Sequence, residues 1–350
     1  MTKETKHYMA LCLQLDCQTI NEFSIEESRN SIMQTIEKVS FQLNGSKALI
    51  GNDTKLVVLP EYFMTGYPLG ESIEEWTEKA AIDIDGEEYN ALSSIAEKNN
   101  IFLSGNAYEK DSKFPGLYFQ TSFIINSSGD LVLRYRRLIS LYAPTPHDVW
   151  DRYLEVYGYD SIFPVAKTEI GKLSCCASEE ILYPEICRAH ALRGAEIILH
   201  SSSEVASNDL TPKDIAKRAR AIENLAYVVS CNSGGINDSP IPVNSVDGMS
   251  KIIDYRGKVM ASSSIGETMG SNAEIDLSAL RRYRNRPGMN NLLSRQRMEL
   301  FNDTYNSVSI YPANNLLDKK TGKFFIPERK HFSETQKQAI ESLSKKDLNS

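Results

Sequence analysis

The residue of this chain whose chemistry most needs an explanation is Ser178, which ends an apolar run and precedes two glutamates. A serine hydroxyl is a weak acid, and a carboxylate alone rarely activates it; serine hydrolases use a histidine or lysine base. No histidine lies beside Ser178 in the sequence, although His147, His190 or His200 could approach it in space. With a carboxylate as its only base, Ser178 is predicted to be a poor nucleophile for acyl transfer.

The segment around Ser178 also has a recognisable spacing. Residues 171–185 read GKLSCCASEEILYPE, and Arg188 and the run RGAEIIL at 193–199 follow. This segment resembles the nucleophile motif of the nitrilase, or carbon-nitrogen hydrolase, superfamily, in its amidase and N-carbamoyl amidohydrolase branch. That motif has a cysteine six residues before its Pro-Glu pair. The resemblance therefore puts Ser178 at the cysteine position and Glu180 at the position of the acid two residues later.

Further segments resemble the same family in the same order. Residues 55–63, KLVVLPEYF, look like the strand that ends in its first glutamate, which makes Glu61 the candidate general base. Residues 129–138, GDLVLRYRRL, look like its lysine segment, with Arg137 at the lysine position. Glu155 is the best match to a second glutamate of amide-cleaving members. With the helix pattern KRARAIEN at 217–224, the resemblance spans roughly residues 8 to 285.

The resemblance implies a mechanism in which a glutamate deprotonates a cysteine, the thiolate attacks an amide or nitrile carbon, and a lysine stabilises the oxyanion. A thiol suits a carboxylate base because its reference pKa is about 8.5, within reach of a desolvated carboxylate. Ser178 lacks that advantage. Arg137 keeps a positive charge that can stabilise an oxyanion, but it cannot deliver a proton as a lysine can. We therefore expect weak or altered activity rather than ordinary amidase turnover.

A cysteine displaced from the motif is the alternative nucleophile, because Cys175 and Cys176 lie just upstream of Ser178. Using either would break the spacing to Glu180 and Pro184 and place the thiol inside a buried strand, so both are interpreted as core thiols. The chain's six cysteines are interpreted as reduced thiols of a cytosolic protein rather than a disulfide framework. No CxxC or HxxxH pair is present, so we predict no metal site and expect no cofactor.

Three side chains beside these motifs are candidates for substrate contact, namely Tyr62, Glu179 and Tyr142. For each aromatic residue the alternative is packing in the core or in a loop. Glu179 and Glu180 could equally form a solvated helix start, where the helix dipole favours acids. For Glu180 the resemblance implies packing and orientation rather than chemistry. Glu155 could likewise be ordinary solvated surface.

Composition limits the partners of the chain. Its 350 residues include 41% hydrophobic and 24% charged residues, with a formal net charge of −7. We do not expect a nucleic-acid partner, because no basic face is evident in the sequence. No apolar run approaches the ~20 residues of a membrane-spanning helix, and the polar amino terminus lacks the apolar region of a secretory signal. A soluble, cytoplasmic protein that binds a small molecule is predicted.

Short apolar runs alternate with longer amphipathic stretches, as in layered α/β domains. The family resemblance implies a four-layer α-β-β-α sandwich. We expect one domain over residues 1–285 and an arm over 286–350 that ends in a polar, helix-like tail from about residue 334. In the family such arms cross a partner subunit, which implies a homodimer or higher homo-oligomer. Strands are expected at 8–15, 56–59, 102–107, 120–126, 131–135, 172–177, 197–199, 227–231, 249–254 and 274–276, and helices at 24–41, 86–98, 184–193, 212–224 and 277–284.

Three functional hypotheses follow. The first is a hydrolase acting on a small amide, nitrile or N-carbamoyl compound, either slowly with a natural serine or with a serine introduced to trap substrate. Arg137 makes an engineered origin a weaker interpretation, because trapping requires only one change. The second is a non-catalytic pseudoenzyme that binds a small ligand or pairs with an active subunit. The third is a repurposed enzyme in which Glu61 acts as a base without a covalent intermediate.

Overall fold

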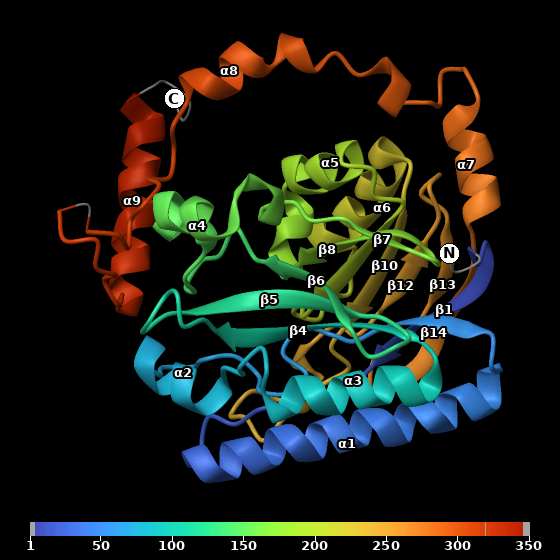
Figure 1. Cartoon of the computed structure of the whole chain (residues 1–350), viewed down its shortest axis with the longest axis horizontal. Coiled ribbons are helices and arrows are strands. Elements are labelled where there is room, and N and C mark those ends of the chain that lie inside the picture. The colour runs from blue at the N-terminus through green and yellow to red at the C-terminus, as the bar shows by residue number, and fades with distance from the viewer. Residues whose placement is uncertain (1–3, 319, 346–350) are drawn as a thin grey trace.

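Two six-stranded β-sheets stack face to face in the computed structural model, which describes residues 4–318 and 320–345 (Figure 1). The strand order of the first sheet is β14 (Thr268–Asp276), β1 (His7–Gln14), β3 (Thr54–Val58), β4 (Phe102–Lys110), β5 (Tyr118–Ile125) and β6 (Leu131–Arg136). The order of the second is β13 (Val259–Ser262), β12 (Lys251–Ile253), β10 (Tyr227–Asn232), β9 (Ile197–Ser202), β8 (Gly171–Ala177) and β7 (Ala166–Thr168). A small parallel sheet pairs β2 (Cys17–Gln18) with β11 (Ile236–Asn237).

Helices cover the outer faces of both sheets, so the predicted four-layer α-β-β-α sandwich is confirmed (Figure 1). Helices α1, α2 and α3 lie against the first sheet, and α5 and α6 lie against the second. The remaining helices lie around the edges of these layers. Their bounds are α1 Ile25–Ile50, α2 Ile73–Ala80, α3 Glu87–Asn99, α4 Trp150–Tyr157, α5 Pro184–Leu192, α6 Pro212–Asn224, α7 Leu277–Asn285, α8 Asn302–Ser307 and α9 Arg329–Lys345.

Strand β1 illustrates how the sequence produces these layers. Successive side chains of a strand point to opposite faces of its sheet. Ala10 and Cys12 pack into the core between the two sheets, whereas Leu11 and Leu13 pack into the core beneath α1 and α3. Both faces are apolar because both are buried. Each strand and helix expected from the sequence corresponds to a strand or helix of the structure.

The structure also contains short elements that the sequence pattern did not predict. They include the helices α2, α4 and α8 and the strands β2, β7, β11 and β13. Most span only one or two turns or a few strand residues, which is too short for an apolar period to stand out from neighbouring loops. Tertiary contacts rather than local sequence therefore determine these segments.

The segment after α7 runs across the top of the molecule in Figure 1, past α5, to the helix α9. Leu316 is fully buried there, in a cluster with Phe114 and Tyr153. The expected polar tail is an ordered helix that begins at Arg329 rather than near residue 334. None of the helices within residues 4–318 and 320–345 is long and apolar enough to cross a membrane.

Helix α1 continues well past its expected end at residue 41. It begins with a capping box in which Ser24 accepts from the Glu27 N–H and Glu27 accepts from the Ser24 N–H. The Asn-Gly pair at 44–45 looks like a helix end in the sequence, yet the helix continues to Ile50. Leu43 and Ser46 are buried on either side of that pair, so packing overrides the poor helix propensity of glycine.

Replacing Gly45 by alanine is expected to stabilise the protein. Gly45 is exposed in the middle of α1, and a Cβ added there would have no heavy atom within 4 Å. Alanine loses less conformational freedom on entering a helix, so Gly45→Ala should raise the free energy of unfolding by roughly 0.5–1 kcal/mol. Urea unfolding measured by circular dichroism checks this value.

The matched control is Ala48→Gly, at an exposed position of the same helix. It should lower the free energy of unfolding by a similar amount. A destabilising Gly45→Ala would mean that α1 does not continue through residue 45 in solution.

Candidate active site

Ser178 lies at a sharp turn between a strand and a helix. Strand β8 ends at Ala177, and Ser178 has a φ of +50° at the start of a short 3-10 turn, Ser178–Leu182. Few residues other than glycine adopt a positive φ, and such conformations concentrate at functional sites. The guanidinium of Arg220 on α6 holds the turn by donating to the carbonyl oxygens of Ile181 and Leu182, at 2.9 and 3.0 Å. The Ser178 side chain is thereby fixed at the end of the second sheet.

Glu61 is fully buried shortly after the end of β3. Its Oε1 accepts from Gln120 Nε2 at 2.6 Å and from Arg137 Nη1 at 3.4 Å. Its Oε2 accepts from the Ser203 N–H, just past β9, at 3.0 Å. This carboxylate therefore links the ends of strands from both sheets, although Glu61 and Ser203 are far apart in the sequence.

Arg137 follows β6 and is buried beside Glu61. Its Nε donates to the Ile139 carbonyl oxygen at 2.8 Å, its Nη1 donates to Gln120 Oε1 at 2.6 Å and to Glu61, and its Nη2 donates to Glu179. Burial opposes the charge, but Tyr62 and Glu61 more than offset it and raise the pKa of Arg137. The group is therefore a fixed cation, and four of its five N–H bonds have these acceptors.

Glu180 ties the Arg137 segment to the Ser178 turn. Its Oε1 accepts from the N–H groups of Leu138 and Ile139 at 2.7 and 3.2 Å. Its Oε2 accepts from the Tyr135 hydroxyl at 2.8 Å and the Ala177 N–H at 3.1 Å. Burial raises the pKa of Glu180 to about 7, and the Arg137 charge opposes this rise. These contacts give Glu180 the orienting position that the family resemblance implied.

The histidines considered in the sequence do not contact the Ser178 hydroxyl. His200 on β9 places Nε2 2.8 Å from the Ser178 carbonyl oxygen and Nδ1 2.9 Å from Ser230 Oγ. The ring of His190 packs against Tyr135 and Phe163. His147 packs near Trp150 and Tyr311, at the arm.

A lysine that the sequence analysis did not select does contact Ser178. Lys213 Nζ, near the start of α6, is 3.4 Å from Ser178 Oγ and 2.9 Å from the carbonyl oxygen of Ser203. Lys213 lies outside every motif segment used above, and nothing in its local sequence distinguishes it from a surface lysine. Only the packing of α6 against the turn that begins at Ser178 brings it to the site.

Glu155 lies outside the group formed by Glu61, Arg137 and Ser178. It is on α4, its side chain is 68% exposed, and it pairs with Arg152 one turn earlier at 2.6 Å. The carboxylate faces solvent because the buried residue of this short helix is Tyr153, which packs on another face. The structure therefore does not bring the expected second glutamate to the site.

The three residues expected to contact substrate have different surroundings. Tyr62 follows Glu61 with a φ of +60° and stacks on Tyr108, with ring centroids 5.8 Å apart. Glu179 is partly exposed and pairs with Arg137. Tyr142 lies under the arm, with the Arg329 guanidinium 4.2 Å from its ring centroid. The structure thus brings Tyr62 and Glu179, but not Tyr142, into contact with the polar group around Arg137.

Cys175 and Cys176 are fully buried in β8. Burial raises the pKa of Cys175 to about 12. Both thiols therefore have the surroundings of core residues rather than of nucleophiles. In the described part of the chain, no three His, Cys, Asp or Glu side chains form a group that could hold a metal ion.

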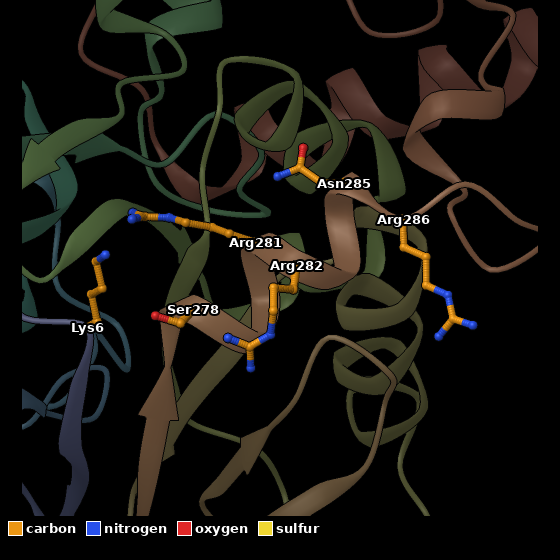
Figure 2. A pocket seen from close by; sticks show the side chains of 6 residues that line it. All are labelled: Lys6, Ser278, Arg281, Arg282, Asn285 and Arg286. Carbon is orange, nitrogen blue, oxygen red and sulfur yellow. The ribbon is translucent and has the colours of Figure 1, made fainter.

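A basic hollow lies at the opposite, amino-terminal end of β8 and β9. Arg281 is held there by Glu196, with Nε 2.6 Å from the carboxylate. Figure 2 shows Arg281 and Arg286 extending in opposite directions, so the cations do not converge on one ligand position. The residues lining the hollow are Lys6, Ser278, Arg281, Arg282, Asn285 and Arg286. This hollow is separate from the Ser178 site.

The four-layer fold is that of the nitrilase superfamily. The family model described as Carbon-nitrogen hydrolase matches residues 18–285. The chain belongs to the carbon-nitrogen hydrolase family.

Individual relatives are similar at modest identity. The 2-oxoglutaramate amidase of Bacillus subtilis is 28% identical over 262 residues, which cover 74% of this chain and 91% of the relative. An omega-amidase of Saccharomyces cerevisiae is 27% identical over 233 residues, which cover 66% and 78%. The crystal structure of a Saccharomyces cerevisiae member of branch 10 of the nitrilase superfamily has a TM-score of 0.64 at 22% identity, covering 80% of this chain and 94% of that one. This structural likeness shows the common fold.

Replacing Glu180 by glutamine is expected to destabilise the fold. An amide has one acceptor oxygen, so its NH₂ group would face the donors of Tyr135 and Ala177. Leaving buried donors unpaired should lower the free energy of unfolding by roughly 2–4 kcal/mol. Urea unfolding measures this loss, and Glu97→Gln on the exposed face of α3 is the control. Equal stability of the two variants would show that Glu180 does not hold these segments together.

The same carboxyl predicts a dependence of stability on pH. Because burial raises the pKa of Glu180 from 4.5 to about 7, the folded chain holds this proton more tightly than the unfolded chain. As the pH rises from about 4.5 to about 7, the contribution of Glu180 to the free energy of unfolding should fall, and it should level off above that window. Urea unfolding at several pH values across this window measures the slope. Glu180→Gln should lack this part of the slope. An equal slope in the parent and in Glu180→Gln would contradict the prediction.

Proposed function

We propose that the chain hydrolyses the C–N bond of a small amide slowly, with Ser178 as the nucleophile. The observation that carries this proposal is the geometry of Ser178, which occupies a strained turn and is followed by Glu179, the ion-pair partner of the buried Arg137. Family membership supports the reaction class, and the names of the amidase relatives support an amide rather than a nitrile or N-carbamoyl compound.

The residues take the following roles in this proposal. Ser178 Oγ attacks the carbonyl carbon of the amide, and charge develops on the carbonyl oxygen. Arg137 supplies the fixed positive charge that stabilises this oxyanion. Glu61 keeps the Arg137 guanidinium in place through the 3.4 Å contact and through their shared partner Gln120. A serine ester is the covalent intermediate, and water releases the acid.

A ligand-binding pseudoenzyme is the second candidate, and one observation favours it. Most N–H groups of Arg137 already donate to Glu61, Glu179, Gln120 and Ile139. A cation so fully engaged has little capacity left for a developing oxyanion. In this case the polar group would hold a ligand without turning it over.

Ammonia release from a panel of small amides, nitriles and N-carbamoyl compounds tests the proposal. The parent should release ammonia slowly from one or more amides. Glu61→Gln should lower the rate by about 100-fold or more, because it weakens the pairing that positions Arg137. Ser178→Cys should raise the rate, since a thiol is the stronger acid and nucleophile. Glu97→Gln, an exposed acid on α3, is the matched control for loss of a carboxylate.

Two outcomes would change the assignment. If the parent releases no ammonia and Ser178→Cys does, the parent is a hydrolase that its serine has inactivated. No ammonia release from any compound would favour the ligand-binding pseudoenzyme instead, if it is found for the parent, for Ser178→Cys and for Arg137→Lys.

We also propose that residues 286–350 form an arm that contacts a second copy of the chain, and that the protein works in the cytoplasm. The arm carries exposed apolar side chains, including Met289, Leu300 and Tyr305, which are 81%, 70% and 59% exposed. The six cysteines are all buried free thiols, which supports a reducing compartment. Light scattering should give a dimer or larger for the parent and a smaller species for Leu300→Asp; a monomeric parent would contradict the arm's role.

A further inference from the structure

Lys213 lies beside the Ser178 hydroxyl and belongs to none of the motifs that identify the site. Its Nζ is 3.4 Å from Ser178 Oγ, 3.5 Å from Ser202 Oγ and 2.9 Å from the Ser203 carbonyl oxygen. Within residues 4–318 and 320–345, Ser178 Oγ has one hydrogen-bond partner, Lys213, whose Nζ donates to it. The basic group in contact with the nucleophile is therefore an amine.

Lys213 differs from the other lysines of this region in its partners. Asp214 Oδ1 pairs with Lys251 at 2.6 Å and with Lys217 at 3.4 Å, and Glu204 lies 3.8 Å from Lys217. No carboxylate of the described residues forms an ion pair with Lys213. Its partners are hydroxyl and carbonyl oxygens alone. A role in neutralising a buried acid therefore does not explain its position.

The start of α6 fixes where Lys213 points. Thr211 caps the helix by accepting from the Asp214 N–H at 3.1 Å, and Pro212 occupies the first helical position. Lys213 follows and is half-buried. Its side chain reaches the end of β9, where Ser202 and Ser203 accept from it. The amine is thus positioned by a capped helix rather than by a mobile loop.

The other candidate bases are already engaged. His200 directs Nε2 to the Ser178 carbonyl oxygen rather than to its hydroxyl. Both carboxylate oxygens of Glu61 accept hydrogen bonds, and Glu179 pairs with Arg137. Glu180 accepts from backbone N–H groups. Of the candidate bases in the described part of the chain, the Lys213 amine is the group that contacts the Ser178 hydroxyl.

We propose that Lys213 is the general base for Ser178, so that a serine–lysine pair performs acyl transfer at this site. The inference rests on the proposed amide hydrolysis. The step requires Nζ in its uncharged form: Nζ takes the Oγ proton as Oγ bonds to the amide carbon, and the C=O electron pair moves to the carbonyl oxygen, which Arg137 stabilises. When the carbonyl re-forms, the C–N bond breaks, the Lys213 ammonium gives its proton to the departing nitrogen, and ammonia leaves.

In deacylation, Lys213 passes a proton from water to Ser178 Oγ. Water attacks the serine ester carbon and gives a proton to the uncharged Lys213 amine. The bond from the acyl carbon to Oγ then breaks, and Oγ takes that proton back. The sum is one amide and one water converted to one acid and one ammonia, with Ser178 and Lys213 returned to their starting forms.

This arrangement matches the chemistry of the substituted nucleophile. A thiol can be deprotonated by a carboxylate, whereas a hydroxyl requires a stronger base such as histidine or lysine. Serine–lysine pairs occur as variants of the catalytic triad on unrelated folds. The 3.4 Å contact places Nζ within reach of Oγ, and catalytic hydrogen bonds commonly tighten in the complex with substrate. Lys213 thus supplies the strong base that the residues of the motif do not offer Ser178.

Covalent labelling by diisopropyl fluorophosphate tests the pair independently of any substrate. Labelling joins Ser178 Oγ to phosphorus and breaks the P–F bond, with the proton passing to Lys213 and fluoride leaving. The parent should be labelled at Ser178, as located by peptide mass spectrometry. Lys213→Met should slow labelling about 100-fold or more, and Lys167→Met, at an exposed position of β7, should not. An unlabelled parent, or equal rates in the parent and Lys213→Met, overturns the proposal.

A second comparison tests whether Lys213→Met slows the reaction merely by misfolding. It measures the effect of this change in two backgrounds, the parent and Ser178→Cys. In the Ser178→Cys background the thiol needs a much weaker base, because its reference pKa is about 8.5, so Lys213→Met should cost less than about 10-fold in ammonia release. In the parent background the same change should cost about 100-fold or more. Equal losses in both backgrounds overturn the proposal. Labelling that depends on Lys213 without any ammonia release would support the serine–lysine pair and refute the proposed amide hydrolysis.

Discussion

The buried positive charge of Arg137 is the constraint on which the rest of this site depends. A charge removed from water needs charged or hydrogen-bonding partners, or its burial costs several kcal/mol. The chain supplies Glu61 after one strand and Glu179 at the start of the nucleophile turn. These partners can meet only if the ends of strands from both sheets are brought together. The requirement to neutralise one guanidinium thus links the stacking of the sheets to the geometry of the site.

Glu180 holds the backbone of two of these strand ends together. Its carboxylate accepts hydrogen bonds from the segment after Arg137, from Tyr135 on β6, and from the residue before Ser178. A carboxylate with several fixed donors has little freedom to move, so it fixes the two strand ends relative to each other. The strained backbone of Ser178 persists because the surrounding hydrogen bonds determine it. The same contacts that stabilise the sandwich therefore aim the hydroxyl.

In the proposed mechanism, the stabilisation of negative charge and the transfer of the proton are assigned to two different side chains. Arginine stays charged under nearly all conditions, so Arg137 can only hold and stabilise negative charge. A lysine can exist in both protonation states, and Lys213 approaches the hydroxyl from a different element, the start of α6. The proposed serine–lysine pair follows from this separation of a fixed cation from an amine. The nucleophile, the charge and the base then come from β8, β6 and α6.

The sequence by itself predicted the layered fold, and it selected three candidate site residues that the structure brings near one another. Apolar runs such as 8–15 specify buried strands, and the spacing of the motifs around Glu61, Arg137 and Ser178 is local information. Other features depended on tertiary structure. Glu155 faces solvent because α4 buries Tyr153 on another face, and no spacing rule predicts that orientation. Lys213 lies 35 residues from Ser178 and reaches it only because α6 packs against the turn that begins at Ser178. Contacts between distant segments depend on how elements pack, which local periodicity does not encode.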